Sequence, residues 1–226
     1  MLSKYKVVLF DSDNTLYNHD IHERTAIFEV LKACGIPTLD EYHILFRDIN
    51  SVVWQEFERG VKHKNGHVVE RFSRFLSAAG IDFCPFKMNE LYIEALSNQC
   101  SPFPESQEVL SVLSKTHKLY IITNGTESIQ VRRFNASPLR PNFSGIFTAD
   151  GVGIQKPYAE FFERVLKDIG SPKHEEVIVI GDSLTSDILG GVNAGLDTCW
   201  YNPNHNENTL GVDPTYEIEK LTELIS

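Results

Sequence analysis

The chain has 226 residues, of which 42% are hydrophobic and 23% are charged, and its formal net charge is −10. These values are typical of a soluble globular protein with one large domain or two smaller ones. The acidic balance argues against a nucleic acid polymer as partner, because phosphate backbones require a basic surface. A small phosphorylated ligand remains possible, since it requires only a local cation.

The N-terminal residues and the cysteines bear on the location of the protein. Residues 1–6 show no signal-peptide pattern, and no apolar stretch approaches the roughly 18 residues of a membrane span. The four cysteines are scattered without a CxxC motif: Cys34, Cys84, Cys100 and Cys199. A disulfide framework is not expected at this size without a secretory signal. We therefore predict a cytoplasmic protein with reduced thiols and no membrane partner.

The first predicted strand, residues 7–10, runs directly into two carboxylates, Asp11 and Asp13. A short apolar run with β-branched residues is typical of a strand that is buried on both faces of a parallel sheet. In open α/β sheets, ligands bind just beyond the carboxyl ends of the strands. Two like charges at such a place are costly unless a cation or a proton separates them. The pattern therefore predicts a metal and catalytic site.

A long helical block follows the first strand. Apolar residues recur at helical spacing without a strand-like run, so we predict that residues 18–99 form an all-helical insert. The remaining core would then consist of residues 1–17 and 100–226. Two pairs of residues have the spacing of a capping box and predict helix starts: Asp20 with Glu23, and Thr38 with Glu41.

In the second half of the chain, predicted strands alternate with predicted helices. Apolar strands are expected at residues 119–122, 177–180 and 198–201. Helices are expected around Val109 and Leu113, over about 158–169, up to Ala194, and near Leu221 at the end. This alternation indicates an α/β fold with a doubly wound, Rossmann-like parallel sheet.

Polar motifs stand at the ends of three of these strands: D-x-D-x-T at residues 11–15, T-N-G at 123–125, and G-D-S-L-T-S-D at 181–187. With these motifs the chain resembles the haloacid dehalogenase (HAD) superfamily, and the helical insert lies where that family has its C1 cap. Residues 187–195 and 199–202 are most similar to the bacterial pyrimidine 5'-nucleotidase branch.

Roles follow for the residues of the first two motifs. Asp11 is the candidate nucleophile, which would form an aspartyl-phosphate. Asp13 would protonate the leaving oxygen and then activate water, and side chains two residues apart in extended backbone share a side. Thr123 can donate its hydroxyl to a phosphoryl oxygen, while Asn124 and Gly125 can offer backbone N–H groups to an anion.

Further roles are implied by the resemblance alone. It implies a Mg²⁺ ion held by Asp11, the backbone carbonyl of Asp13, and Asp182, a hard-oxygen set suited to this ion. Asp187 would support the metal waters or the lysine, and Lys156 would anchor the phosphoryl group. Three residues at the cap hinge are candidates for substrate contact: Tyr17, Asn18 and His19.

The chain departs from the family pattern at three positions. Asn14 stands where many members have glycine, and asparagine is the best substitute if φ is positive there. Ser12 replaces a large apolar residue, which would widen or polarise the site. Ala159 occupies the place of a second proline after Lys156, which bears on the course of that loop.

Competing motifs fail on inspection. Read as an EF-hand, the loop that starts at Asp11 has Leu16 instead of glycine at its sixth position and His22 instead of glutamate at its twelfth. His22 also lacks the second histidine of a zinc-protease helix. Residues 151–153 lack the third glycine of a dinucleotide-binding motif.

These observations predict a Mg²⁺-dependent phosphomonoester hydrolase with an aspartate nucleophile. The expected partner is a small phosphorylated metabolite, with a pyrimidine nucleoside monophosphate as the favoured substrate. Alternatives are a HAD phosphatase acting on phosphoglycolate or a sugar phosphate, and a non-catalytic phospho-ligand-binding protein. The resemblance disfavours haloacid dehalogenation, because Asp13 supplies an acid/base where that activity uses another residue. A monomer or weak homodimer is expected.

Overall fold

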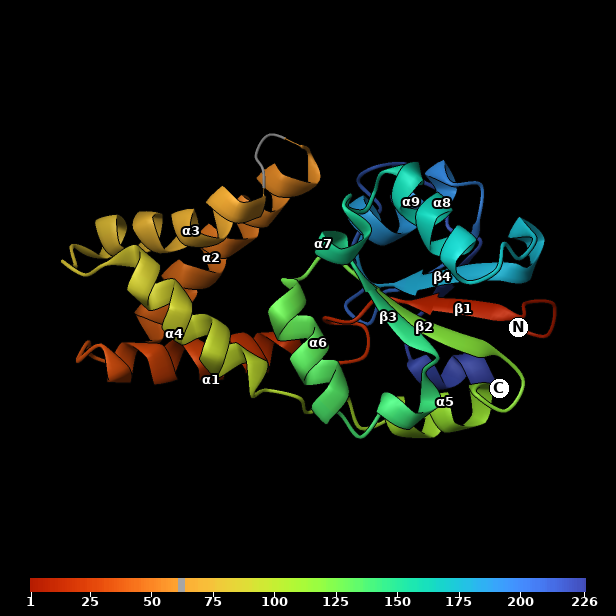
Figure 1. Cartoon of the computed structure of the whole chain (residues 1–226), viewed down its shortest axis with the longest axis horizontal. Coiled ribbons are helices and arrows are strands. Elements are labelled where there is room, and N and C mark those ends of the chain that lie inside the picture. The colour runs from red at the N-terminus through yellow and green to blue at the C-terminus, as the bar shows by residue number, and fades with distance from the viewer. Residues whose placement is uncertain (61–63) are drawn as a thin grey trace. The chain divides into compact units, whose positions relative to one another are not determined.

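The computed structural model describes residues 1–60 and 64–226, with side chains for all of these except residues 64–67 (Figure 1). The chain divides into two compact units, one made of residues 1–18 and 100–226 and the other of residues 19–99. Within the described part of the chain, no helix combines the length and apolar character that crossing a membrane would require.

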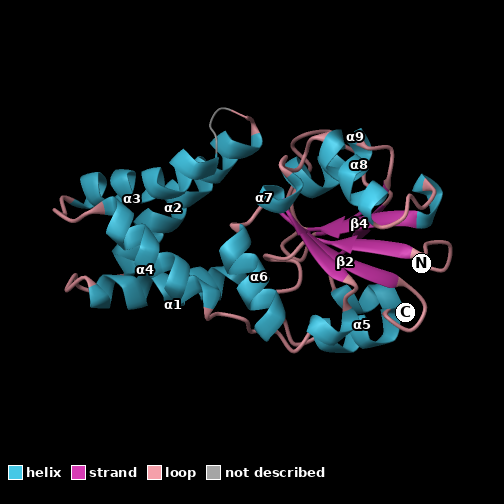
Figure 2. Cartoon of the chain, in the orientation of Figure 1, coloured by secondary structure: helices cyan, strands magenta, loops and turns pink. Residues whose placement is uncertain are grey.

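The first unit is built on one sheet of six parallel strands, drawn in magenta in Figure 2. The strand order is β3-β2-β1-β4-β5-β6, so the chain steps outward from β1 first to one side and then to the other. The strands are β1 (Val7–Phe10), β2 (Lys118–Thr123), β3 (Gly145–Thr148), β4 (Val177–Gly181), β5 (Asp197–Tyr201) and β6 (Tyr216–Ile218). This doubly wound topology places the ends of β1 and β4 beside the point where the order reverses, the usual ligand site of such sheets.

Helices cover both faces of the sheet (Figure 2). They are α5 (Ser106–Leu113), α6 (Glu127–Ala136), α7 (Ala149–Val152), α8 (Ala159–Asp168) and α9 (Leu189–Asn193). A π-helical segment, Leu184–Ile188, precedes α9, and a 3-10 helix, Leu221–Ile225, closes the chain. Shorter 3-10 turns lie at Arg140–Asn142 and His174–Glu176.

Alternate residues of β1 belong to different cores, because successive side chains of a strand point to opposite faces. Val8 and Phe10 pack in a cluster that includes residues of α5 and of the C-terminal 3-10 helix. Val7 and Leu9 pack in a second cluster, which contains the buried face of α8. Both faces of β1 are therefore buried, and the strand fixes the position of Asp11, which directly follows it.

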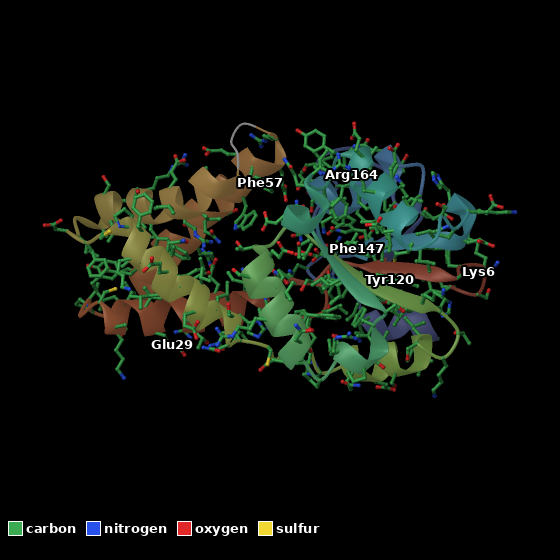
Figure 3. All side chains as sticks on the ribbon, viewed as in Figure 1. Lys6, Glu29, Phe57, Tyr120, Phe147 and Arg164 are labelled. Atoms are coloured by element: carbon green, nitrogen blue, oxygen red, sulfur yellow. The ribbon has the colours of Figure 1, made fainter. Side chains whose placement is uncertain are left out.

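Two strands were not predicted from the sequence. β3 has only four residues at the sheet edge, and its Phe147 packs beside Tyr120 of β2 at 5.9 Å between ring centroids (Figure 3). β6 has three residues, of which Glu217 is exposed, in a segment that we expected to be a polar loop. Neither strand is long enough to show the alternation of apolar and polar residues that would predict it from the sequence. Each forms by pairing with a neighbouring strand, β2 for β3 and β5 for β6.

The described residues of the second unit form four helices, α1 (His19–Ala33), α2 (Asp40–Glu58), α3 (Lys64–Ala79) and α4 (Pro85–Ser97). Aromatic rings from three of them form its core, with Phe46 and Phe72 stacked at 5.1 Å and Tyr92 packed against both.

The two predicted capping boxes are wrong. α1 begins at His19, so Asp20 lies in its first turn instead of capping it. α2 begins at Asp40 after Leu39, which makes no side-chain cap bond. Acidic residues in the first turn stabilise both helices through the helix dipole instead.

Candidate active site

The loop after β1 carries Asp11 at its start and reverses direction within a few residues. The N–H of Asp11 donates to the carbonyl of Ile180 at 2.8 Å, which extends the pairing of β1 with β4 past the end of the strand. Asn14 has a φ of 60° and donates its N–H to the carbonyl of Tyr17 at 2.8 Å. Asparagine tolerates this left-handed conformation better than other non-glycine residues, as expected from the sequence.

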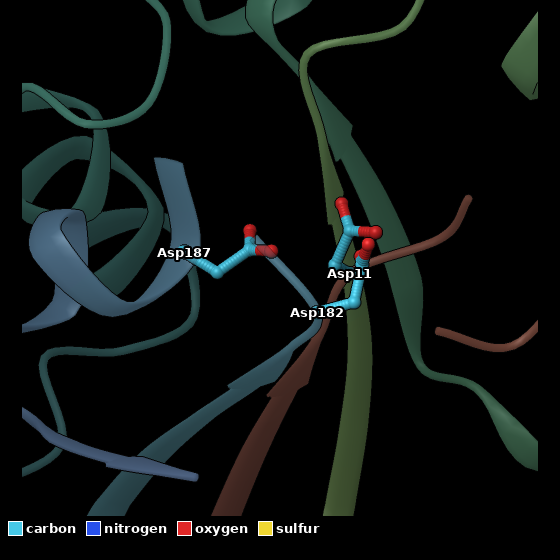
Figure 4. A group of neighbouring side chains, drawn as sticks. All are labelled: Asp11, Asp182 and Asp187. Atoms are coloured by element: carbon cyan, nitrogen blue, oxygen red, sulfur yellow. The ribbon is translucent and has the colours of Figure 1, made fainter. Parts of the chain in front are cut away.

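Three carboxylates converge at the ends of β1 and β4 (Figure 4). Asp11, Asp182 and Asp187 each offer an oxygen, and these oxygens lie within 4.8 Å of one another. Asp182 directly follows β4, while Asp187 lies in the π-helical segment and is fully buried. Gly181 makes this approach possible, because a Cβ atom there would lie 2.2 Å from Oδ2 of Asp187.

A buried lysine stands among these acids. Nζ of Lys156 donates to Oδ1 of Asp11 at 2.7 Å and to Oδ1 of Asp187 at 2.6 Å, and the side chain is only 1% exposed. Nζ also donates to the carbonyl of Ile122 in β2 at 3.1 Å. Lys156 therefore joins the end of β2 to the acid cluster, and its ammonium group partly neutralises that cluster.

The electrostatics of the cluster favour a bound cation. Burial raises the pKa of Asp11 to about 7, even though Lys156 opposes this shift. Burial and the nearby Asp11 and Asp187 hold the pKa of Asp182 well above its usual range. Burial alone would lower the pKa of Lys156, but Asp11 and Asp187 raise it. Three carboxylates against one ammonium leave an excess of negative charge, and an all-oxygen donor set of this kind fits Mg²⁺.

The loop after β2 supplies the next predicted residues. Thr123 Oγ1 accepts from the N–H of Gly125 at 3.0 Å, so its own proton can be donated elsewhere. The Gly125 N–H, which we expected to face a phosphate, is thus directed to Thr123. Asn124 has a role that the sequence did not show: its side chain exchanges two hydrogen bonds of 2.9 Å with the backbone of Lys156.

Residues that the sequence did not single out hold the metal-site acids. Thr15 accepts from the N–H of Asp182 at 3.0 Å and donates to its carboxylate at 3.1 Å. Trp200 donates its indole N–H to the carbonyl of Asp182 at 2.9 Å, and the N–H of Ser183 donates to Asp187 at 3.1 Å. Thr15 closes the first motif, so its place in that motif was an available signal.

Asp13 is held from α6. Its two carboxylate oxygens accept from Gln130 at 2.6 Å and from Arg133 at 2.8 Å. These residues were also missed. The sequence did contain one indication of their role. The two residues are three apart in a helix that follows the T-N-G motif, so they share one face of that helix.

The hinge residues lie at the junction of the two units. Tyr17 is buried, and its hydroxyl donates to Ser137 at 2.7 Å. Its side chain is therefore part of the packing within the first unit. Asn18 ends the first segment of that unit, and His19 begins α1. Substrate contact by these residues stays a prediction.

Comparison with known proteins agrees with this architecture. The family of haloacid dehalogenase-like hydrolases matches residues 5–195. The HAD-hydrolase YfnB of Bacillus subtilis strain 168 is 35% identical over 223 residues, which cover 99% of this chain and 95% of the relative. A crystal structure of YfnB bound to magnesium has a TM-score of 0.92 and covers 97% of this chain and 96% of its own.

Two further relatives have a stated activity. The pyrimidine 5'-nucleotidase PynA of Streptococcus pneumoniae R6 is 36% identical, with 98% of this chain and 94% of PynA covered. The pyrimidine 5'-nucleotidase YjjG of Escherichia coli K12 is 31% identical, with 98% and 96% covered. The family match and these near full-length similarities lead to one conclusion: the chain belongs to the haloacid dehalogenase-like hydrolases and is an enzyme of that family.

Proposed function

We propose that the protein is a Mg²⁺-dependent phosphomonoester hydrolase that uses Asp11 as its nucleophile. The observation that carries this proposal is the buried contact of Lys156 with both Asp11 and Asp187, next to Asp182. A phosphate ester resists an anionic nucleophile because its oxygens repel it, so a hydrolase must bring positive charge to the nucleophile. This cluster does so with a lysine side chain that is only 1% exposed.

In the first step, a carboxylate oxygen of Asp11 attacks phosphorus. The new Oδ–P bond forms as the ester P–O bond breaks, which yields an aspartyl-phosphate. Asp13 gives its proton to the leaving oxygen, so that the product departs as an alcohol instead of an alkoxide. Lys156 and the hydroxyl of Thr123 stabilise the phosphoryl oxygens, and Lys156 also fixes the orientation of Asp11.

In the second step, water attacks the same phosphorus from the side of the departed alcohol. Asp13, now ionised, accepts the proton of this water, while the Oδ–P bond breaks and restores Asp11. Inorganic phosphate leaves, and Asp13 is again protonated. Asp11, the Asp13 carbonyl and Asp182 would hold Mg²⁺, with Asp187 in support, and the ion would supply the positive charge that lets an anionic ester approach.

The substrate that we propose is a pyrimidine nucleoside 5'-monophosphate. Its support is the similarity to PynA and YjjG, both pyrimidine 5'-nucleotidases, over nearly the whole chain. A substrate of this kind needs no basic surface beyond the local cation, which agrees with a net charge of −10.

Phosphate release tests this proposal. The purified protein is assayed with dUMP, dTMP, UMP, phosphoglycolate and hexose phosphates, with Mg²⁺ and with EDTA in its place. We expect release from the pyrimidine nucleotides that depends on Mg²⁺. Preference for phosphoglycolate or a hexose phosphate would refute the substrate assignment, and binding without release from any ester would refute the catalytic one.

We also propose that the enzyme acts in the cytoplasm as a monomer or weak homodimer. All four cysteines are free thiols, which supports a reducing compartment. Light scattering over a range of protein concentrations tests the oligomeric state, and a tight higher oligomer would contradict the proposal.

A further inference from the structure

The side chain of Asp13 is held at both oxygens by two residues of α6. Nε2 of Gln130 donates to Oδ2 at 2.6 Å, and Nη1 of Arg133 donates to Oδ1 at 2.8 Å. Residues three apart on a helix share a face, so one face of α6 presents both donors to the loop after β1. We call Gln130 and Arg133 the Asp13 clamp.

The guanidinium of Arg133 is fixed by its surroundings. The side chain is buried, and its guanidinium lies over the ring of Tyr17 at 5.2 Å from the centroid. The hydroxyl of Tyr17 in turn donates to Ser137 at 2.7 Å, just past the end of α6. A buried guanidinium is costly unless it is paired, so its placement at Asp13 is a strong constraint on both side chains.

The amide of Gln130 has a defined orientation. Oε1 accepts from the hydroxyl of Ser12 at 3.1 Å, which directs the NH₂ group to Asp13. The same side chain passes over Gly125, where a Cβ atom would lie 2.2 Å from Nε2. Gln130 therefore ties the loop after β1 to the loop after β2, and Ser12 is the polar residue that orients it.

We propose that Gln130 and Arg133 are positioning residues that fix the rotamer of Asp13 for proton transfer to the leaving oxygen. This inference rests on the proposed role of Asp13 as acid/base. A side chain that is misplaced by about 1 Å can lower a rate by about a hundredfold, and Asp13 is partly open to solvent, with 24% of its side chain exposed. Without the clamp, its carboxyl group would occupy several rotamers.

Leaving-group dependence separates positioning of the acid from general damage. An alkyl ester such as dUMP needs a proton on its leaving oxygen, whereas p-nitrophenolate leaves readily without one. The value of kcat/KM reports the steps up to transfer of the phosphoryl group to Asp11. We therefore compare kcat/KM for dUMP and p-nitrophenyl phosphate in the wild type, Gln130→Met and Arg133→Met, all with Mg²⁺.

We expect each variant to lose about tenfold or more on dUMP, within the range of general acid catalysis, and less than about threefold on p-nitrophenyl phosphate. Arg133→Lys should recover part of the loss on dUMP, because it restores a cation without the planar guanidinium. Ser12→Ala should show a smaller loss of the same selectivity. Arg132→Met changes an exposed arginine of the same helix and should leave both values unchanged.

Equal losses on both esters, or no loss on either, would overturn the inference. If Arg133→Met does not fold, as judged by circular dichroism, the more nearly isosteric Gln130→Met still decides the question. Failure of the inference is distinct from failure of the proposed function, because the latter would appear as a wild-type protein that hydrolyses neither ester. If the wild type hydrolyses hexose phosphates instead of dUMP, the same comparison is made with a hexose phosphate.

Discussion

Nζ of Lys156 lies 2.6 Å from Oδ1 of Asp187, and neither side chain is more than 1% exposed. The other oxygen of Asp187 accepts the N–H of Ser183 at 3.1 Å. A buried charge with several partners is fixed in space, so this pair sets the position of the ammonium group that also contacts Asp11. Removal of either charge leaves the other buried without its partner.

Lys156→Met is therefore expected to abolish hydrolysis and to lower the free energy of unfolding by about 3–5 kcal/mol at pH 8. Urea denaturation of the metal-free protein measures the second effect, and phosphate release the first. Lys173→Met is the matched control, because Lys173 is exposed and its nearest carboxylate is at 3.7 Å. Stability equal to that of the control would contradict the buried pair.

Asp11→Asn is expected to abolish turnover and to stabilise the metal-free protein above pH 7. Burial raises the pKa of Asp11 to about 7, so the folded protein binds this proton more tightly than the unfolded chain, whose value is about 4. Stability from the protonated form is complete below about pH 4 and is lost as the pH rises through about 7. The Asn variant lacks this loss.

Thermal unfolding at pH 4.5 and pH 8 checks the sign of this effect. The melting temperature of Asp11→Asn should exceed that of the wild type by about 4 °C or more at pH 8, and the difference should shrink at pH 4.5. Asp213→Asn, at an exposed loop position, should show no such dependence. A difference of the same size at both pH values would refute the assignment.

Thr15→Val should weaken Mg²⁺ binding by about tenfold or more, because residues that orient metal ligands contribute on this scale. Its hydroxyl both accepts from the Asp182 N–H and donates to the Asp182 carboxylate. Calorimetric titration with Mg²⁺ and the Mg²⁺ concentration for half-maximal activity both report the effect. Thr15→Ser keeps the hydroxyl and should stay close to the wild type. Equal Mg²⁺ affinity in the Val and Ser variants would contradict the role.

Gly190→Ala should destabilise the fold by about 1–3 kcal/mol, the usual cost of overpacking. A Cβ atom at this position would lie 2.6 Å from the ring of Phe162 and 3.1 Å from the backbone of Pro157. Gly145→Ala is the matched control, because its nearest neighbour would be a side-chain atom of Tyr120 at 3.6 Å. Urea denaturation of both variants tests the difference, and equal stability would show that α8 and α9 can move apart.

Long apolar runs made much of the fold predictable. β1 and β4 are buried throughout, and β2 and β5 are mostly buried. Their carboxyl ends meet because parallel strands place them on one edge of the sheet. This is why Asp11 and Asp182, far apart in sequence, could be expected side by side. β3 and β6 could not be predicted, because three or four residues at a sheet edge carry too little pattern.

The support of the acids was harder to read from the sequence. Gln130 and Arg133 lie on a predominantly polar helix, α6. The sequence of this helix does not indicate that the Arg133 side chain is buried. Asn124 was predicted to offer a backbone N–H group to an anion. In the structure its side-chain amide forms two hydrogen bonds with the Lys156 backbone. Such contacts depend on which loops lie together in space, and a pattern along one segment does not contain that information.

The exchange between the Asn124 amide and the Lys156 backbone anchors the lysine loop from the loop after β2. Its two hydrogen bonds of 2.9 Å join the loop that carries Lys156 to the loop after β2. Ala159 is the first residue of α8, a position at which proline is also well tolerated, so helix propensity does not explain the alanine. The contact from Asn124 therefore positions the lysine backbone, and with it the ammonium group, without a second proline in the loop.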